Sequence, residues 1–221
     1  KSFQVANQPT ATLTVSPPTG MSVLAGTDYV GWTMPLSATY AVDTADGDSI
    51  GQTAIHVVIP SGAESTIVGY GTGNLAGSYT PSAPGMYTFK AYVWTGAGGS
   101  GNWLMLASTS VQVASLPTTS FTADADSLNL GQSTTIRANF TSDTADGDNL
   151  TGSQLWMLDP AGNGSYLSGS WFGDGSVGPG VDLHPTFTPT MAGTYTFTTS
   201  EASTVCSWWN PVQLTIAVAK A

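Results

Sequence analysis

Charge is scarce in this chain, and positive charge is almost absent. Charged residues make up 8% of the 221 residues, and the only basic ones are Lys1, Lys90, Arg137 and Lys220. So few basic side chains cannot build the positive surface that nucleic acid or anionic lipid requires, and we expect neither partner. With a net charge of −10, the surface must consist mostly of Thr, Ser, Gly, Asn and Gln. That composition favours strands and turns over exposed helices.

Long hydrophobic runs and paired cysteines are also missing. No apolar run approaches the ~20 residues that span a bilayer as a helix, so we predict no membrane span. The single cysteine, Cys206, cannot form an intrachain disulfide. We expect it to be a small buried apolar residue, with an intermolecular bridge as the alternative. A chain rich in Thr, Ser and Gly, acidic and poor in Lys is typical of secreted or cell-surface proteins.

Motifs for catalysis are lacking as well. The two histidines, His56 and His184, do not have metal-binding spacing. The sequence contains no nucleophile elbow, phosphate-binding loop or haem-attachment motif. We therefore predict that the chain is not an enzyme.

What the sequence does contain is an internal repeat. The hexapeptide Asp43–Asp48 recurs without change as Asp143–Asp148, 100 residues later. This offset is the size of one small β-sandwich domain. Three further landmarks recur in the same order: Leu24-Ala-Gly-Thr27 with Leu130-Gly-Gln132, Tyr79–Phe89 with Phe187–Phe197, and Val111-Gln112 with Val212-Gln213. Four ordered landmarks indicate duplication of one ancestral unit.

The hydrophobic pattern within each unit has a period of two, which is the period of a half-buried strand. Alternating apolar residues are found at Ile55, Val57 and Ile59, at Tyr87, Phe89 and Ala91, at Ile136, Ala138 and Phe140, and at Leu214, Ile216 and Val218. No segment has convincing helical periodicity. We predict an all-β chain with a first domain at residues 1–114, including an N-terminal extension strand, a linker at 115–119 and a second domain at 120–221.

The segment from Phe187 to Phe197, with its counterpart in the first unit and the Asp159-Pro-Ala-Gly162 turn, resembles the immunoglobulin-like and PKD-like modules of bacterial and archaeal surface proteins. The resemblance covers nearly the whole chain. It implies two tandem immunoglobulin-like β-sandwich domains with extracellular binding, spacing or assembly roles, and it implies no catalytic residues.

The repeated hexapeptide is a candidate calcium site. Each copy places three carboxylates within six residues, together with a Gly that permits a tight turn. The candidate ligands are Asp43, Asp46, Asp48, Asp143, Asp146 and Asp148. The alternative is an acidic surface turn in which the Asp side chains accept hydrogen bonds from their own backbone.

Tryptophan is abundant, with seven in the chain. Trp94 and Trp103 flank a Gly-rich turn in the predicted last hairpin of the first unit, and Trp208 and Trp209 lie in the equivalent hairpin of the second. We expect this hairpin to share one pole of its domain with the acidic loop. Exposed Trp side chains there could contact glycans or a protein partner, whereas buried ones would complete the core. We expect Trp156, on a predicted central strand, to be buried.

Two further features bear on the surface. The glycosylation acceptor pattern occurs at Asn139, Asn149 and Asn163. Phe3 and Val5 alternate with polar residues ahead of Pro9, so this segment could pair with the sheet edge of a neighbouring subunit, or be the first strand of its own domain.

These features favour a non-enzymatic structural subunit of a surface filament, sheath or layer, with self-association or other surface proteins as partners. The alternatives are a carbohydrate-binding or adhesive module and a viral surface or decoration protein.

Overall fold

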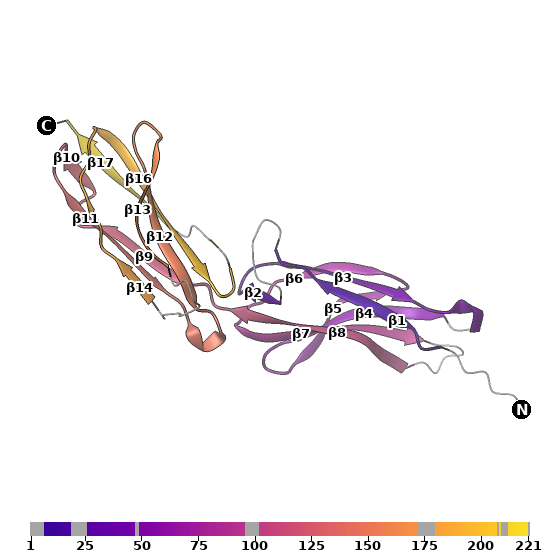
Figure 1. Cartoon of the computed structure of the whole chain (residues 1–221). Coiled ribbons are helices and arrows are strands. Elements are labelled where there is room, and N and C mark those ends of the chain that lie inside the picture. Colours follow the sequence, from indigo (N-terminus) through magenta and orange to yellow (C-terminus); the bar gives the residue numbers. More distant parts are fainter. Residues whose placement is uncertain are drawn as a thin grey trace, which may run out of the picture. The chain divides into compact units, whose positions relative to one another are not determined.

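The computed structural model describes residues 7–18, 26–46, 49–95, 102–171, 180–206, 208 and 212–220. The chain separates into two compact units after Ala114. We call the described residues up to Ala114 unit 1 and those from Ser115 onward unit 2. Both are built almost entirely of strands (Figure 1).

Unit 1 contains eight strands and one short 3-10 turn among its described residues. They are β1 (Thr10–Val15), β2 (Thr27–Tyr29), β3 (Met34–Ala41), η1 (Thr44–Asp46), β4 (Ile50–Val58), β5 (Glu64–Gly71), β6 (Leu75–Tyr79), β7 (Gly85–Thr95) and β8 (Asn102–Ala114). One sheet has the order β1-β3-β6, and the larger one has the order β2-β8-β7-β4-β5.

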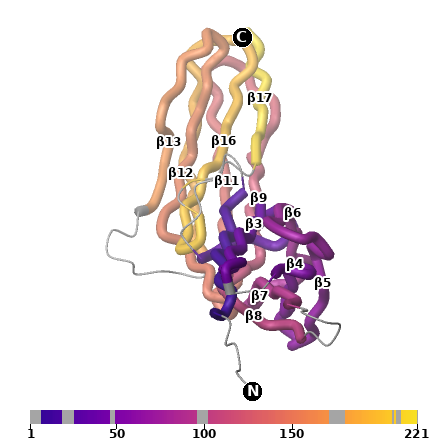
Figure 2. The backbone as a smooth tube through the Cα atoms, turned by 90° about the vertical axis from the view of Figure 1, so that its right-hand side faces the viewer, coloured from indigo at the N-terminus to yellow at the C-terminus, as the bar shows by residue number. Residues whose placement is uncertain are grey.

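Unit 2 repeats this plan. Its elements are β9 (Thr118–Ala123), β10 (Ser127–Asn129), β11 (Thr134–Thr141), η2 (Thr144–Asp146), β12 (Leu150–Leu158), β13 (Gly164–Trp171), β14 (Gly180–Leu183), β15 (Thr186–Phe187), β16 (Gly193–Ser203) and β17 (Gln213–Ala219). β11 pairs with β9, β14 and β15, and the larger sheet has the order β10-β17-β16-β12-β13. Its long strands β12, β13, β16 and β17 run side by side in Figure 2. Most strand pairs are antiparallel, but β2–β8 and β10–β17 are parallel.

Each unit buries its core between its two sheets. In unit 2, Ile136, Ala138 and Phe140 of β11 are fully buried and pack with Tyr195 and Phe197 of β16. The corresponding residues of unit 1 are Leu36 and Ala38 of β3 with Tyr87, Phe89 and Ala91 of β7. The alternating runs predicted from the sequence are therefore confirmed as inward-facing, and the fold is an immunoglobulin-like β-sandwich in each unit.

The shared Gly-x-Tyr motif fixes the same corner in both units. The Tyr87 hydroxyl donates to the Ala83 carbonyl at 2.9 Å, and the Tyr195 hydroxyl donates to the Met191 carbonyl at 3.3 Å. This hydrogen bond back to the upstream backbone is the tyrosine corner of immunoglobulin-like folds.

The glycine two residues before each tyrosine is required by space and by backbone conformation. Gly85 and Gly193 have φ of 130° and 134°. A Cβ at Gly85 would lie 2.7 Å from Pro60, and one at Gly193 would lie 2.6 Å from Pro160. The two corners are thus built in the same way.

One sequence landmark was aligned wrongly. The counterpart of Leu130-Gly-Gln132 is Val30-Gly31-Trp32, because the Val30 N–H donates to Ala114 and the Leu130 N–H donates to Ala219, the last residue of β8 and of β17. Gly31 and Gly131 also share a positive φ. The residues at 24 and 25 lie outside the described part. In addition, β9 begins at Thr118, within the segment expected to be a linker.

Cys206 is buried, as expected, and its N–H donates to the Ser203 hydroxyl at 3.1 Å. Within the part of the chain that the structure describes, no helix has the length and hydropathy needed to cross a membrane.

Candidate binding surfaces

The larger sheet of each unit has one face toward the core and an outer face on the opposite side. On β7, Tyr87, Phe89, Ala91 and Val93 are buried, so the residues between them, up to Trp94, lie on the outer face. On β12, Leu155 and Met157 pack into the core of unit 2. Gln154, Trp156 and Leu158 therefore belong to the outer face.

The outer face of unit 1 carries an aromatic patch that we define as Tyr70, Trp94, Trp103 and Met105. Trp94 and Trp103 are directly opposite each other in the β7–β8 pair. The ring of Tyr70, from β5 at the edge of the same sheet, has its centroid 6.0 Å from that of Trp103. Tyr70, Trp103 and Met105 are exposed, whereas Trp94 is half-buried. The structure thus brings together the two tryptophans of the predicted hairpin and adds a tyrosine that the sequence did not single out.

Glycine makes room for this patch. A Cβ at Gly51 would lie 2.6 Å from the Trp94 ring, so the indole packs directly on the backbone of β4. The ring is therefore held against the sheet.

A charged network occupies the same outer face. The Glu64 carboxylate accepts hydrogen bonds from Lys90 Nζ at 2.6 Å and from the Tyr92 hydroxyl at 2.9 Å, and it contacts His56 Nδ1 at 3.0 Å. The hydrogen bond from Lys90 contributes most to lowering the pKa of Glu64. The side chains that could recognise a charged ligand here already bind one another.

The outer face of unit 2 carries a different set of rings. Trp156 of β12 is opposite Tyr166 of β13, and the two rings form an edge-to-face pair with centroids 5.9 Å apart. Trp156 is 42% exposed, so the prediction that it is buried was wrong. The apolar run Leu155–Leu158 obscured an ordinary alternation, in which Trp156 has to point opposite to Leu155 and Met157.

Trp208 lies against this same face. Together with Tyr166, Gln154, Ser153, Gly169 and Ser170 it lines a hollow of about 140 Å³. Trp208 is 41% exposed. It reaches the sheet surface from the segment that follows β16, the segment in which the sequence analysis placed a possible ligand contact. Trp209 lies outside the described residues.

In the second acidic loop, the carboxylates of Asp143 and Asp146 accept hydrogen bonds from backbone N–H groups, whereas the Asp148 side chain is fully buried. Asp143 Oδ1 accepts the Ala145 N–H at 3.1 Å. Asp146 Oδ1 accepts the Asp148 N–H at 3.1 Å, and its Oδ2 accepts the Ser115 N–H at 2.6 Å. Among the described residues, no group of three or more carboxylate, histidine or cysteine side chains could hold a metal ion. These hydrogen bonds support the turn-stabilising interpretation.

The first loop begins in the same way, with Asp43 Oδ1 accepting the Ala45 N–H at 3.0 Å. Asp46 ends η1, and Asp48 lies outside the described residues. Calcium binding by either loop stays a prediction from the sequence.

The acidic loop and the last hairpin do share a pole in unit 2. The Thr204 hydroxyl donates to the Gly147 carbonyl at 3.0 Å, and the Thr204 N–H donates to the Asn149 carbonyl at 2.8 Å. The hairpin segment is thus bonded to the loop, as we expected from the fold.

Besides Asp148, the carboxyl groups of Asp28 and Glu201 are buried, and neither was anticipated from the sequence. Burial raises the pKa of Asp28, on β2, to about 6. Burial, with the nearby Asp148 charge as a smaller contribution, raises the pKa of Glu201 on β16 to about 7, although a hydrogen bond from Thr119 acts in the opposite direction. A single acidic residue in a strand of alternating polar and apolar residues does not indicate from the sequence that its carboxyl group is buried.

The three glycosylation candidates occupy different environments. Asn163 is exposed in the turn after β12, where its Nδ2 donates to Asp159 Oδ2 at 2.9 Å. Asn139 lies in the middle of β11, and its Nδ2 donates to Asp182. Asn149 is half-buried beside Thr204. Phe3 and Val5, the proposed assembly residues, lie outside the described part.

No protein-family model and no curated protein matches the chain. Among solved structures, it is similar to the fibronectin(III)-like modules of CbhA from Clostridium thermocellum, with 15% identity, a TM-score of 0.37 and 95% of each chain covered. It is also similar to an I-band fragment of titin, with 11% identity, a TM-score of 0.42 and coverage of 97% of this chain and 67% of that one. A third similar structure is the adhesin InvE from Yersinia pseudotuberculosis, with 14% identity, a TM-score of 0.31 and coverage of 93% and 58%. The immunoglobulin-like assignment rests on the strand pairing within each unit.

Proposed function

We propose that this chain is a non-enzymatic structural subunit of a secreted or cell-surface assembly, such as a filament, sheath or layer, and that subunits join by strand addition at β1. The observation that carries the proposal is the open edge of β1. Its six residues, Thr-Ala-Thr-Leu-Thr-Val, contain no charge and no proline. Its register with β3 is continuous, without a bulge. Natural edge strands normally carry at least one of these protections against pairing.

The direction of the free backbone groups follows from the pairing. The Ser16 N–H donates to the Pro35 carbonyl at 2.9 Å, opposite it in the antiparallel pair. Because backbone groups alternate sides along a strand, the residues at even positions of β1 bond to β3. The N–H groups of Ala11, Leu13 and Val15 then face away from the sheet. In the described residues, β3 is the only strand that pairs with β1.

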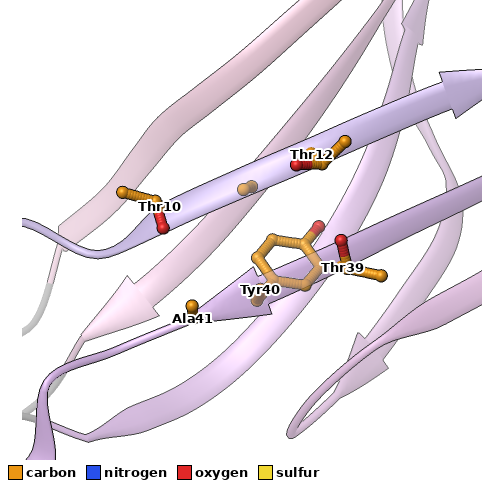
Figure 3. Close-up of a pocket in the computed structure, with 6 residues that line it drawn as sticks. Thr10, Thr12, Thr39, Tyr40 and Ala41 are labelled. Atoms are coloured by element: carbon orange, nitrogen blue, oxygen red, sulfur yellow. The ribbon is translucent and has the colours of Figure 1, made fainter.

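A shallow depression of about 110 Å³ lies between β1 and β3, near the beginning of β1 (Figure 3). It is lined by Thr10, Ala11 and Thr12 of β1 and by Thr39, Tyr40 and Ala41 of β3. On β1 itself the side chains at this place are small, so a neighbouring strand can approach the free edge without displacing a large group. By contrast, β5, an edge strand of the larger sheet, carries protections of this kind. It has two register shifts against β4 and it carries the charged residue Glu64.

The segment at residues 1–8, ahead of β1, supplies the strand in this proposal. Its alternation at Phe3 and Val5 suits a strand added to an edge, where main-chain hydrogen bonds give affinity and alternate side chains give specificity. A head-to-tail contact of this kind that does not close on itself produces an open filament.

The test compares three variants of the full chain by electron microscopy and sedimentation velocity. Deleting residues 1–8 removes the donor strand, and Ala11→Pro removes one outward N–H from the acceptor edge without removing a bond to β3. Ala11→Thr keeps that N–H and is the matched control. We expect the first two changes to abolish assembly and the third to preserve it, with all three chains folded by circular dichroism. Assembly that persists after both the deletion and Ala11→Pro would exclude strand addition at β1.

A further inference from the structure

The hollow on the outer face of unit 2 has the composition of a sugar site. It is bounded by two aromatic side chains, Tyr166 and Trp208, which are 56% and 41% exposed. The other lining residues are Gln154, Ser153, Gly169 and Ser170. Its volume of about 140 Å³ is several times the ~30 Å³ share of one liquid water molecule. The hollow can therefore take a small ring.

The Tyr166 ring has neighbours on two sides. On one side it meets Trp156 edge to face, at an interplanar angle of 80°. On the other, its hydroxyl lies over Gly169, where a Cβ would come within 2.5 Å of the hydroxyl oxygen and 2.7 Å of the Ser153 carbonyl oxygen. Glycine at this place lets the ring lie close to the sheet. A ring held in place before binding loses less conformational entropy when a ligand stacks on it.

The lining contains no charged residue, and this limits the class of ligand. A phosphate, a carboxylate or a cationic group would lose its hydration without gaining a countercharge. A ligand that fits has an apolar face, which stacks on the aromatic rings. It also has hydroxyl groups, which hydrogen bond to the side-chain amide of Gln154 and to backbone or hydroxyl oxygens of the serines. A neutral pyranose ring combines both properties.

We infer that the hollow formed by Tyr166, Trp208 and Gln154 binds one residue of a neutral oligosaccharide. The aromatic side chains stack on the apolar face of the sugar, and Gln154 hydrogen bonds to its hydroxyl groups. This inference does not depend on strand addition at β1, because the site lies on β12, β13 and the segment after β16.

The probe is a panel of neutral oligosaccharides made of glucose, mannose, galactose or N-acetylglucosamine, titrated into the full chain by isothermal calorimetry. Four variants are compared with the unchanged chain: Trp208→Ala, Tyr166→Ala, Gln154→Met and Leu158→Ala. The last is the matched control, because Leu158 is 46% exposed on the same outer face of unit 2 and does not line the hollow. Thermal unfolding shows that each variant is folded.

We expect saturable binding of at least one of these sugars. Loss of either aromatic ring should weaken binding about tenfold or more, the scale of losing one stacking contact in other ring-stacking sites. Gln154→Met, which keeps the shape of the side chain, should weaken it less, and Leu158→Ala should leave it unchanged. The inference is overturned if no neutral sugar on the panel binds saturably. It is also overturned if binding persists in both ring variants or is lost in the Leu158→Ala control.

Discussion

Replacing Glu201 tests whether a buried carboxyl makes the stability of unit 2 depend on pH. Glu201 lies opposite Ser153 in the β12–β16 pair and is 2% exposed. Among the described residues, the only hydrogen bond to its carboxyl group comes from the Thr119 hydroxyl, to Oε2, at 3.4 Å. Burial is the main reason that its pKa rises from 4.5 to about 7. The corresponding position of unit 1, opposite Thr53, is Val93, so the fold does not require an acid there.

The direction in which stability changes with pH follows from proton binding. Because the folded state holds the Glu201 proton more tightly than the unfolded state, the free energy of unfolding is highest below the unfolded pKa of 4.5. It falls as the pH rises toward the folded pKa of about 7 and changes no further above it. A rise in pKa of this size corresponds to roughly 3 kcal/mol lost across the window.

Glu201→Gln removes the titration, and Glu201→Val reproduces the solution found in unit 1. We expect the stability difference between either variant and the unchanged chain to shift in favour of the variant, by about 3 kcal/mol, between pH 4.5 and pH 8. The pKa of Asp28 is also raised, so its contribution to stability falls as the pH rises in the same way. Asp28 is unchanged in all the variants, so this contribution cancels when the variants are compared with the unchanged chain. The assay is hydrogen exchange with mass spectrometry on peptides from β12 and β16, which reports on unit 2 alone.

Asp126→Asn, which removes an exposed carboxyl from the same unit, gives the baseline for such a change. A stability difference that stays flat from pH 4.5 to pH 8 for both Glu201 variants would refute the reasoning, because a buried acid cannot be neutralised without this linkage.

Three other substitutions test the local architecture by chemical denaturation. Gly193→Ala should destabilise unit 2 by about 2 kcal/mol or more, because φ is 134° and the new Cβ would lie 2.6 Å from Pro160. The control is Gly73→Ala, which should change stability little. At Gly73 a new Cβ would meet nothing within 4 Å, and φ is not in the left-handed region. Tyr195→Phe should lower stability by about 1 kcal/mol through loss of the corner hydrogen bond to Met191, and an unchanged denaturation midpoint would argue against that role. Asp143→Ala should lower it by about 1 kcal/mol through loss of the cap on η2; if the loss appears only when calcium is present and not with a chelator, the metal interpretation replaces the turn interpretation.

The sequence predicts the inward-facing strands well because alternation of apolar and polar residues directly reflects which side faces the core. Ile136, Ala138 and Phe140 are fully buried, and Tyr87 and Tyr195 form the same corner. Alternation fails where a strand is apolar on both faces, as at Trp156, since hydrophobicity alone does not then distinguish core from surface.

The candidate surfaces were only partly predictable, because they depend on contacts between distant segments. Trp94, Trp103 and Trp208 were singled out as possible contacts, and all three lie on outer sheet faces. Their partners Tyr70 and Tyr166 come from β5 and β13, and nothing in the local sequence connects them with a tryptophan more than 30 residues away. The short strands β2 and β10 were missed because three residues carry too little periodicity to be recognised.

These short strands have a mechanical consequence. β10 runs parallel to β17, with Ser127, Leu128 and Asn129 opposite Ala217, Val218 and Ala219, and β2 pairs in the same way with β8. When a chain is pulled from both ends, tension reaches the beginning of β10 after β9, which precedes it and pairs with β11, has been pulled away, and it leaves β17 at its end. In a parallel pair these points are at opposite ends of the ladder, so the strands are loaded in shear and their hydrogen bonds share the force instead of opening one by one. In each unit, this parallel strand pair is therefore oriented to resist stretching along the polypeptide.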